Sequence, residues 1–422
     1  MHVCRRWRSV VFGSPRRLDL QLLCTATTRA STLDIWPVLP LAIRPDSTFI
    51  LDKGVRNIAA LLKFSERVCQ IDLLVLSSRL ERVLAAMEVP FPALTYLWLE
   101  SYGEPVPVLR DSFLCGCAPQ LRFLRMVRIP FPGLPKVLLS ATHLVDLRLR
   151  NIPHSGYISP EEMVTALSTL TSLQELQLEF QSPRSRPEPE DHPPPPTRSV
   201  LQLLPVLTRF WFKGACEYLD NLVARTNAPR LNDMSVNLFN QIIFDTPQFI
   251  QFISRTPMLN VLEEARIYFG FDTASINLSS QTFDYGKPGK LNVKISCDKL
   301  DWQVSSLEQV CSSCLPPLSK LGDLYISGAT YWQPGVQDNI ENMLWLELLR
   351  PFTCVENLYL SQEFEPRIVP ALRELVEDST EVVPMLQNIF LSARRTRTRL
   401  PWHRRVSTRD LSKEASGTLV SL

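Results

Sequence analysis

The chain has 422 residues, 45% of them hydrophobic, and 45 basic residues against 43 acidic ones give a formal net charge of +2. This near balance argues against a nucleic-acid partner, because phosphate binding needs a concentrated basic face. No secretory signal is recognisable, and no stretch approaches the roughly 18 uninterrupted apolar residues of a transmembrane helix. The ten cysteines do not show the paired spacing of a disulfide framework, which fits reduced thiols. We therefore expect a cytoplasmic or nuclear protein without a membrane partner.

The first predicted element is a short helix within residues 1–15. Val3, Trp7 and Val10 recur at helical spacing and form one apolar stripe, with arginines largely off it. Pro15, after a glycine and a serine, is typical of a helix end. We treat residues 1–15 as a unit distinct from the rest of the chain.

The next elements come from a recurring phrase, Leu-x-x-Leu-x-Leu. Its copies start at Leu94, Leu121, Leu144, Leu173, Leu207, Leu231, Leu262, Leu321, Val355 and Leu386. Neighbouring copies start 23 to 34 residues apart, apart from one step of 59 that we interpret as two units with a degenerate copy at Leu291. This period and phrase are the signature of leucine-rich repeats. Each phrase predicts a short strand with its leucines inward. The expected core therefore includes Leu144, Leu147, Leu149, Leu173, Leu176 and Leu178.

Helices are predicted between these strands. Ser159 is placed as an N-cap with Glu162 completing a capping box, Ser78 as a second N-cap, and Pro247 as the first residue of a third helix. Strand followed by helix, repeated, predicts the α/β fold of a leucine-rich-repeat solenoid over residues 16–391. In that fold, a curved horseshoe, parallel strands line the concave side and helices the convex side.

Two segments depart from the repeat pattern. Residues 181–198 hold seven prolines and predict an insertion loop within one repeat; a polyproline ligand for an SH3 or WW domain is the alternative. Residues 392–422 carry eight basic and two acidic residues without the phrase. We expect a disordered basic tail there, with a nuclear-localisation or nucleic-acid patch as the alternative.

The N-terminal string VCRRWRSVVFGSPRRLDLQL, which starts at Val3, resembles the last helix of an F-box and the lead-in to its repeats. The resemblance is to fungal, basidiomycete-type F-box proteins with leucine-rich repeats. Further phrases that resemble this family are Leu33–Pro40, Ser140–Tyr157 and Pro351–Ser361. Only the last F-box helix has a counterpart, so the resemblance implies an F-box truncated at its N-terminus, with residues 1–15 as its remnant.

The resemblance implies a function: the substrate-recognition, or adaptor, subunit of a Skp–cullin–F-box ubiquitin ligase. Val3, Cys4 and Trp7 would then contact the Skp-type adaptor protein, weakly if the F-box is truncated. The repeats would bind a protein substrate whose identity is unknown. The alternative is a repeat-only scaffold for protein–protein interaction with no link to ubiquitin.

No motif indicates an enzyme. The chain has five histidines and 14 glycines, and it lacks the HExxH, GxSxG, GxGxxG and GxxxxGK[ST] patterns. Cys311 and Cys314 have zinc-knuckle spacing, but no second pair follows, so we expect structural thiols. We therefore predict no catalytic residue, no metal and no cofactor.

The candidate binding residues stand between the last two apolar positions of the phrase, on the concave face. Apart from Ser235, they are Trp98, Arg125, Arg148, Gln177, Trp211, Arg266, Tyr325, Tyr359 and Phe390. Aromatic residues and arginine dominate binding hot spots. We predict that Trp98, Arg125, Arg148 and Trp211 form one stripe, suited to a substrate with an acidic or phosphorylated stretch beside an apolar anchor. The alternative is that the aromatic rings stack on one another or lie under loops.

Overall fold

The computed structural model describes residues 20–36, 38–44, 50–131, 136–183, 201–239, 244–259, 262–279, 291–329, 341–378, 382–392 and 402–407. The chain divides into two compact units, Met1–Leu207 (unit 1) and Thr208–Leu422 (unit 2). Residues 1–15, with Val3, Cys4 and Trp7, lie outside the described residues, as does most of the proline-rich segment 181–198.

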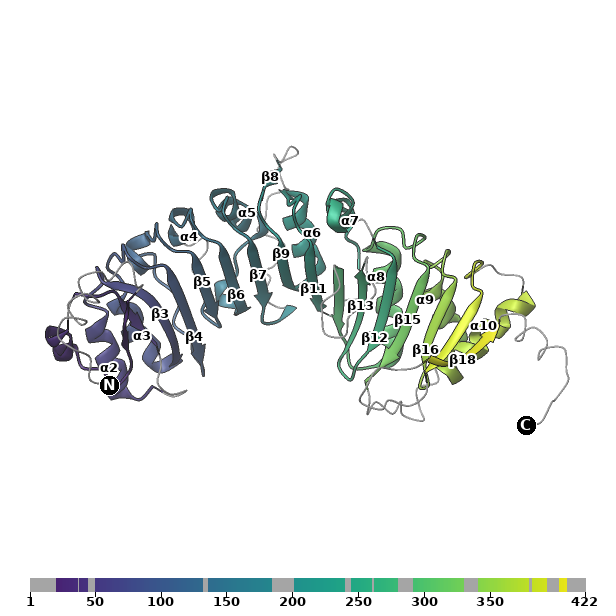
Figure 1. Cartoon of the computed structure of the whole chain (residues 1–422), viewed down its shortest axis with the longest axis horizontal. Helices are drawn as coiled ribbons and strands as arrows, with labels where there is room; N and C mark the ends of the chain where they lie inside the picture. Colours follow the sequence, from purple (N-terminus) through teal and green to yellow (C-terminus); the bar gives the residue numbers. More distant parts are fainter. Residues whose placement is uncertain are drawn as a thin grey trace, which may run out of the picture. The chain divides into compact units, whose positions relative to one another are not determined.

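Unit 1 contains a sheet in which neighbours along the chain are neighbours in space (Figure 1). Its strands, all paired in parallel, are β1 (Leu22–Cys24), β2 (Leu41–Ile43), β3 (Val68–Leu76), β4 (Tyr96–Tyr102), β5 (Phe123–Val127), β6 (Asp146–Ile152) and β7 (Glu175–Phe180). A short strand, β8 (Gln202–Leu203), follows. The four predicted phrases of this unit all form strands.

Helices connect the strands of unit 1. They are the α-helices α2 (Asp52–Leu61), α3 (Ser77–Ala86), α4 (Lys136–Ser140) and α5 (Pro160–Thr169), and the 3-10 helices η1 (Ala30–Ile35), η2 (Phe113–Gly116) and η3 (His154–Gly156). Consecutive helices contact one another, α2 with α3 and α4 with α5, so they share one face of the sheet. We call the opposite sheet face the open face.

The predicted capping box of α5 is confirmed. Ser159 Oγ accepts from Glu162 N at 3.2 Å, and Glu162 Oε2 accepts from Ser159 N at 3.0 Å. The predicted N-cap at Ser78 is wrong. Helix α3 begins one residue earlier, at Ser77, and its N-cap, Leu76, makes no side-chain cap hydrogen bond. The helix follows directly on β3, so the strand end sets where it starts.

Unit 2 also contains an extended sheet, with the spatial order β9-β11-β14-β13-β12-β15-β16-β17-β18. Its strands are β9 (Arg209–Gly214), β11 (Asp233–Phe239), β12 (Glu264–Phe269), β13 (Thr273–Ser279), β14 (Leu291–Ser296), β15 (Asp323–Gly328), β16 (Asn357–Ser361), β17 (Asn388–Ser392) and β18 (Trp402–Ser407). A short strand, β10 (Thr226–Asn227), lies outside this order. The six phrases of this unit form strands as predicted.

Helices α6 (Cys216–Ala224), α7 (Pro247–Ser254), α8 (Leu300–Ser313), α9 (Asn342–Leu349) and α10 (Glu365–Asp378) and the 3-10 helix η6 (Pro257–Leu259) connect the strands of unit 2. Helix α6 contacts α7, α8 contacts α9, and α9 contacts α10. Pro247 is the first residue of α7, as predicted. Its preceding Thr246 makes no side-chain cap; instead Phe249 N donates to Asp220 Oδ1 of α6 at 2.9 Å.

The expectation of an all-parallel sheet is wrong at two strands. Strand β13 runs antiparallel to both β12 and β14, and β18 runs antiparallel to β17. The 59-residue step therefore holds a three-strand meander rather than two regular repeats. The copy placed at Leu291 is also three residues out of register, because Leu291 pairs with Met234, the fourth residue of its phrase.

One buried side chain ties the meander to the helix layer. Gln303 of α8 is 1% exposed, and its Nε2 donates to Gly270 O at 3.0 Å and to Cys297 O at 2.7 Å. Gly270 follows β12 and Cys297 follows β14. A single amide thus donates to carbonyls at the ends of two different strands.

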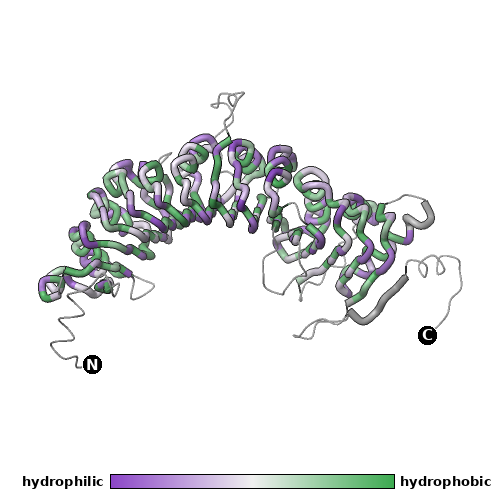
Figure 2. The backbone as a smooth tube through the Cα atoms, turned by 45° about the horizontal axis from the view of Figure 1, so that its top comes forward, coloured by the Kyte–Doolittle hydropathy of each residue, from purple (hydrophilic) through white to green (hydrophobic). Residues whose placement is uncertain are grey.

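The core lies between sheet and helices in each unit. Hydrophobic and hydrophilic residues alternate along the strands (Figure 2), as expected for a sheet with one covered face. All six predicted core leucines of β6, β7 and their lead-ins are at most 1% exposed. Among the described residues, no helix is both long and apolar enough to cross a bilayer.

Candidate functional site

The open face of unit 1 carries a row of side chains in direct cross-strand register, which we call the unit 1 row. From β3 to β7 it consists of Asp72, Trp98, Arg125, Arg148 and Gln177. Each is half-exposed, while the residues on either side of it in its strand are buried or nearly so. The stripe predicted for Trp98, Arg125 and Arg148 is therefore present within unit 1, and no loop buries these side chains.

Asp72 belongs to this row although the sequence analysis missed it. Its strand follows the repeat phrase with Val68 and Ile71 in place of leucine. Burial raises the pKa of Asp72, an effect that Arg44 and Arg125 oppose and Glu100 reinforces. A search that accepted valine and isoleucine at the leucine positions would have found this residue.

Trp98 and Arg125 form one stacked pair. The Arg125 guanidinium carbon lies 4.2 Å from the centre of the Trp98 ring, well within the range of a cation–π contact. Trp98 Nε1 and Arg125 Nε are both buried and have no hydrogen-bond partner. Burial lowers the pKa of Arg125, and the neighbouring Arg150 and Arg148 lower it further. Glu100 and Tyr96 oppose this lowering, but Arg125 makes no direct ion pair with a described carboxylate.

Arg148 differs from Arg125 because carboxylates hold it on both sides. Its Nε lies 2.9 Å from Asp146 Oδ1, and its Nη2 lies 2.8 Å from Glu175 Oε2. Asp146 and Glu175 are directly opposed on β6 and β7. Such partly buried, two-sided ion pairs fix the side chain in place. Arg148 is therefore part of a neutral, ordered strip of the face.

In unit 2, too, we call the sheet face opposite the helices the open face. It has its own row of side chains, which we call the unit 2 row: Trp211, Ser235, Asn292, Asn277, Arg266, Tyr325, Tyr359 and Phe390. Three strands, β11, β14 and β13, separate Trp211 of β9 from Arg266 of β12. Two of them belong to the meander and place Asn292 and Asn277 in the row. The sequence analysis missed these two asparagines, since neither strand carries the leucine phrase in the right register.

Tyr325, Tyr359 and Phe390 form a continuous stack, which we call the aromatic ladder. Ring centres are 4.2 Å apart for Tyr325 and Tyr359 and 4.7 Å apart for Tyr359 and Phe390, at interplanar angles of 6° and 12°. The Arg266 guanidinium lies 4.1 Å above Tyr325 and extends the stack. The alternative reading of the aromatic positions, rings stacked on one another, is therefore confirmed for these three residues.

A polar row runs beside the ladder on the same face. Asn357 Nδ2 donates to Asp323 Oδ1 at 2.9 Å, and Asn388 Nδ2 donates to Asn357 Oδ1 at 2.8 Å. Glu264 pairs with Arg266. Burial raises the pKa of Tyr359, as does the nearby Asp323. These contacts occupy polar groups and ring faces alike, so a partner can reach mainly ring edges.

The two cysteines with zinc-knuckle spacing are buried thiols, whereas Cys115, Cys117 and Cys354 are exposed. Cys311 and Cys314 are 3% and 1% exposed, and Cys314 Sγ approaches Phe244 O at 3.7 Å. Burial raises the pKa of Cys311 and raises that of Cys314 to about 11, which keeps both protonated at neutral pH. No group of three or more metal-ligating side chains occurs among the described residues.

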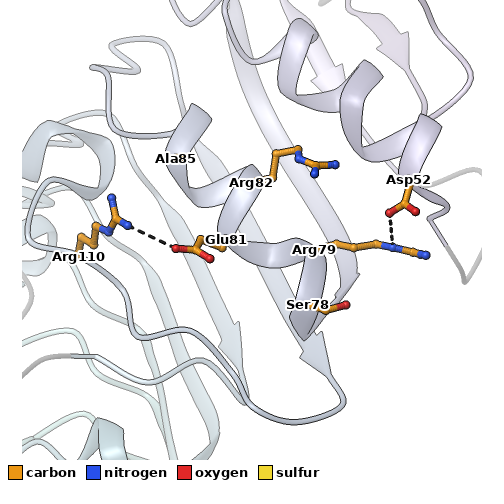
Figure 3. Close-up of a pocket in the computed structure, with 7 residues that line it drawn as sticks. All are labelled: Asp52, Ser78, Arg79, Glu81, Arg82, Ala85 and Arg110. Carbon is orange, nitrogen blue, oxygen red and sulfur yellow. Dashed lines mark hydrogen bonds and ion pairs between the residues drawn. The ribbon is translucent and has the colours of Figure 1, made fainter.

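A polar hollow of about 580 Å³ lies on the helix side of unit 1, beside α3 (Figure 3). Arg79 Nε lies 2.7 Å from Asp52 Oδ1, and Arg110 Nη2 lies 3.5 Å from Glu81 Oε1. Most of the charge that lines the hollow is therefore paired near the surface, and surface pairs of this kind contribute little to stability. The hollow offers no arrangement of nucleophile, base and oxyanion donors.

Comparison of the chain with protein-family models and with curated proteins gives no match. The class of protein that fold and site define is a two-unit α/β protein with mostly parallel sheets and a substantial open face in each unit.

Proposed function

We propose that the chain is a leucine-rich-repeat protein that serves as the substrate-recognition subunit of a Skp–cullin–F-box ubiquitin ligase. The adaptor would bind the N-terminal segment with Val3, Cys4 and Trp7, and the open face would hold the substrate. Transfer of ubiquitin then depends on proximity, because tethering raises the effective concentration of substrate lysines near the conjugating enzyme. The chain contributes binding and no catalytic group.

The observation that carries the binding role is the in-register unit 1 row. Trp98, Arg125 and Arg148 stand side by side on consecutive parallel strands, half-exposed and uncovered. Neighbouring strands lie about 4.8 Å apart, so the row presents regularly spaced contacts to one extended segment of a partner. The link to ubiquitin rests on the F-box resemblance of the N-terminal string.

Co-expression with a Skp-type adaptor tests the proposal. The full chain should bind the adaptor weakly in a pull-down, and Trp7→Ala should weaken this binding further. Trp302→Ala is a matched control, because Trp302 is 53% exposed on α8 and plays no part in the proposed contact. Absence of any adaptor complex, or equal loss with both variants, would leave the repeat-only scaffold as the better description.

A further inference from the structure

We propose that Arg125 binds a side-chain carboxylate in an extended acidic segment of the partner, with Trp98 as the residue that positions the guanidinium. The inference rests on the proposed function in one respect, namely that the partner is a substrate of the ligase. It assigns partner recognition to one cation of unit 1 rather than to the whole open face. It also names the chemical group of the partner that this cation binds.

Of Arg125, Arg148 and Arg150 on the unit 1 open face, Arg125 alone makes no direct ion pair with a described carboxylate; Asp72 and Glu100 interact with it at longer range. Arg148 is held by two carboxylates, and Arg150 Nε lies 3.3 Å from Glu179 Oε2. Arg125 makes no hydrogen bond or ion pair with the residues described, and its contact is the Trp98 ring. A guanidinium in that situation is desolvated on one side without compensation.

The geometry leaves the outer part of this guanidinium for a ligand. Nε is buried, whereas the two Nη atoms are neither buried nor bonded to a described residue. Two Nη donors in one plane match the two oxygens of a carboxylate. Stacking on Trp98 holds that plane in place, so less side-chain freedom is lost when the anion binds.

The surrounding charge favours a carboxylate over a phosphate. Asp72 and Glu100 affect or are affected by the charge of Arg125, and Asp146 and Glu175 stand on the next two strands. Arg148 neutralises Asp146 and Glu175, so Asp72 and Glu100 are the acids that act on a ligand of Arg125. They repel a dianionic phosphate about twice as strongly as a singly charged carboxylate. A singly charged carboxylate needs only the Arg125 cation.

An apolar contact lies next to this cation. Phe123 is 38% exposed and stands two residues before Arg125 on β5, so both point to the open face. Its ring lies 6.0 Å from that of Tyr96 on β4. Crossing from β4 to β7 spans about 14 Å, which roughly four extended residues cover. The expected segment is therefore short, with an acidic residue beside an apolar one.

An array of extended nine-residue peptides tests the inference on the full chain. The peptides carry Glu, Gln or phosphoserine at the central position, each flanked by leucine. Wild type should prefer Glu, and Arg125→Gln should weaken binding of the Glu peptide about 10- to 100-fold. Arg125→Glu should transfer the preference to a peptide with central Lys. Trp98→Phe should keep most of the preference and Trp98→Ala should reduce it.

Arg122→Gln is the matched control, because Arg122 is exposed just before β5, outside the unit 1 row, and its removal changes net charge equally. Equal binding of Glu and Gln peptides, a preference for phosphoserine, or equal loss with Arg122→Gln would overturn the inference. Unchanged thermal unfolding of Arg125→Gln excludes loss of fold. Adaptor binding, measured separately on the same variants, fails only if the proposed function fails.

Discussion

Tyr359→Ala tests whether the aromatic ladder stabilises the fold or serves recognition. Tyr359 is the central ring, with neighbours at 4.2 and 4.7 Å. Each aromatic pair contributes about 0.5–1.5 kcal/mol beyond area burial, and the half-buried ring adds roughly 1 kcal/mol. We therefore expect the free energy of unfolding to fall by about 2–4 kcal/mol in urea titrations followed by circular dichroism.

Two variants give the comparison. Tyr359→Phe keeps both stacks and should cost about 1 kcal/mol or less. Phe123→Ala removes one tilted contact at 6.0 Å from a more exposed ring and should cost about 0.5–1.5 kcal/mol. If Tyr359→Ala unfolds at the same urea concentration as wild type, or costs no more than Phe123→Ala, the stacking argument is refuted.

Leu147→Ala should lower the free energy of unfolding by about 2–5 kcal/mol, because Leu147 is fully buried and its loss leaves a cavity; an unchanged melting profile would contradict the register. Ser159→Ala should cost about 1 kcal/mol by removing the capping box, measured in the same titration against Ser168→Ala, a serine of α5 outside the cap. Burial raises the pKa of Asp233, and Arg209 partly opposes this effect. The contribution of Asp233 to stability therefore falls as the pH rises from about 3.9 through the raised pKa of the folded state. Asp233→Asn should therefore gain stability over wild type at pH 7 more than at pH 4; an equal difference at both would contradict it.

The strands were predictable because leucine and its equivalents alternate in every phrase. That alternation by itself places Leu147 and Leu149 in the core and Arg148 on the opposite face, as the structure confirms. The pairing register was also predictable, because neighbouring parallel strands with the same phrase align equivalent positions of that phrase. Substitution by related residues weakens the method: Val68 and Ile71 concealed β3, and with it Asp72.

The meander of unit 2 could not be predicted from the phrase. Strand β13 pairs antiparallel with two strands, and its surroundings include contacts between residues far apart in the sequence, such as the hydrogen bond of Gln303 to Gly270. Local periodicity carries no information on which edge a strand joins. The strand Trp402–Ser407 was likewise unexpected, because its basic residues suggested a segment without regular structure.

Residue type alone also overestimated the number of side chains that are available to a partner. Arginine and aromatic residues were all counted as contacts for a partner, yet Arg148 is neutralised by Asp146 and the ladder rings cover one another's faces. Asp146 and Glu175 occupy the third position of the phrase, so their ion pairs with Arg148 could be predicted once the strand register was known. Arg125 stands out because it stacks on Trp98 and makes no direct ion pair with a described carboxylate.

Reconstituted ubiquitin transfer tests the central claim most directly. The reaction contains the full chain, a Skp-type adaptor with its cullin module, a charged conjugating enzyme, and a lysine-bearing carrier protein fused to the leucine-flanked Glu peptide. The account predicts modification of the carrier by wild type, at least tenfold less with Arg125→Glu, and recovery when the peptide carries Lys instead. Peptide binding without any transfer of ubiquitin, or transfer that does not depend on Arg125, would contradict it.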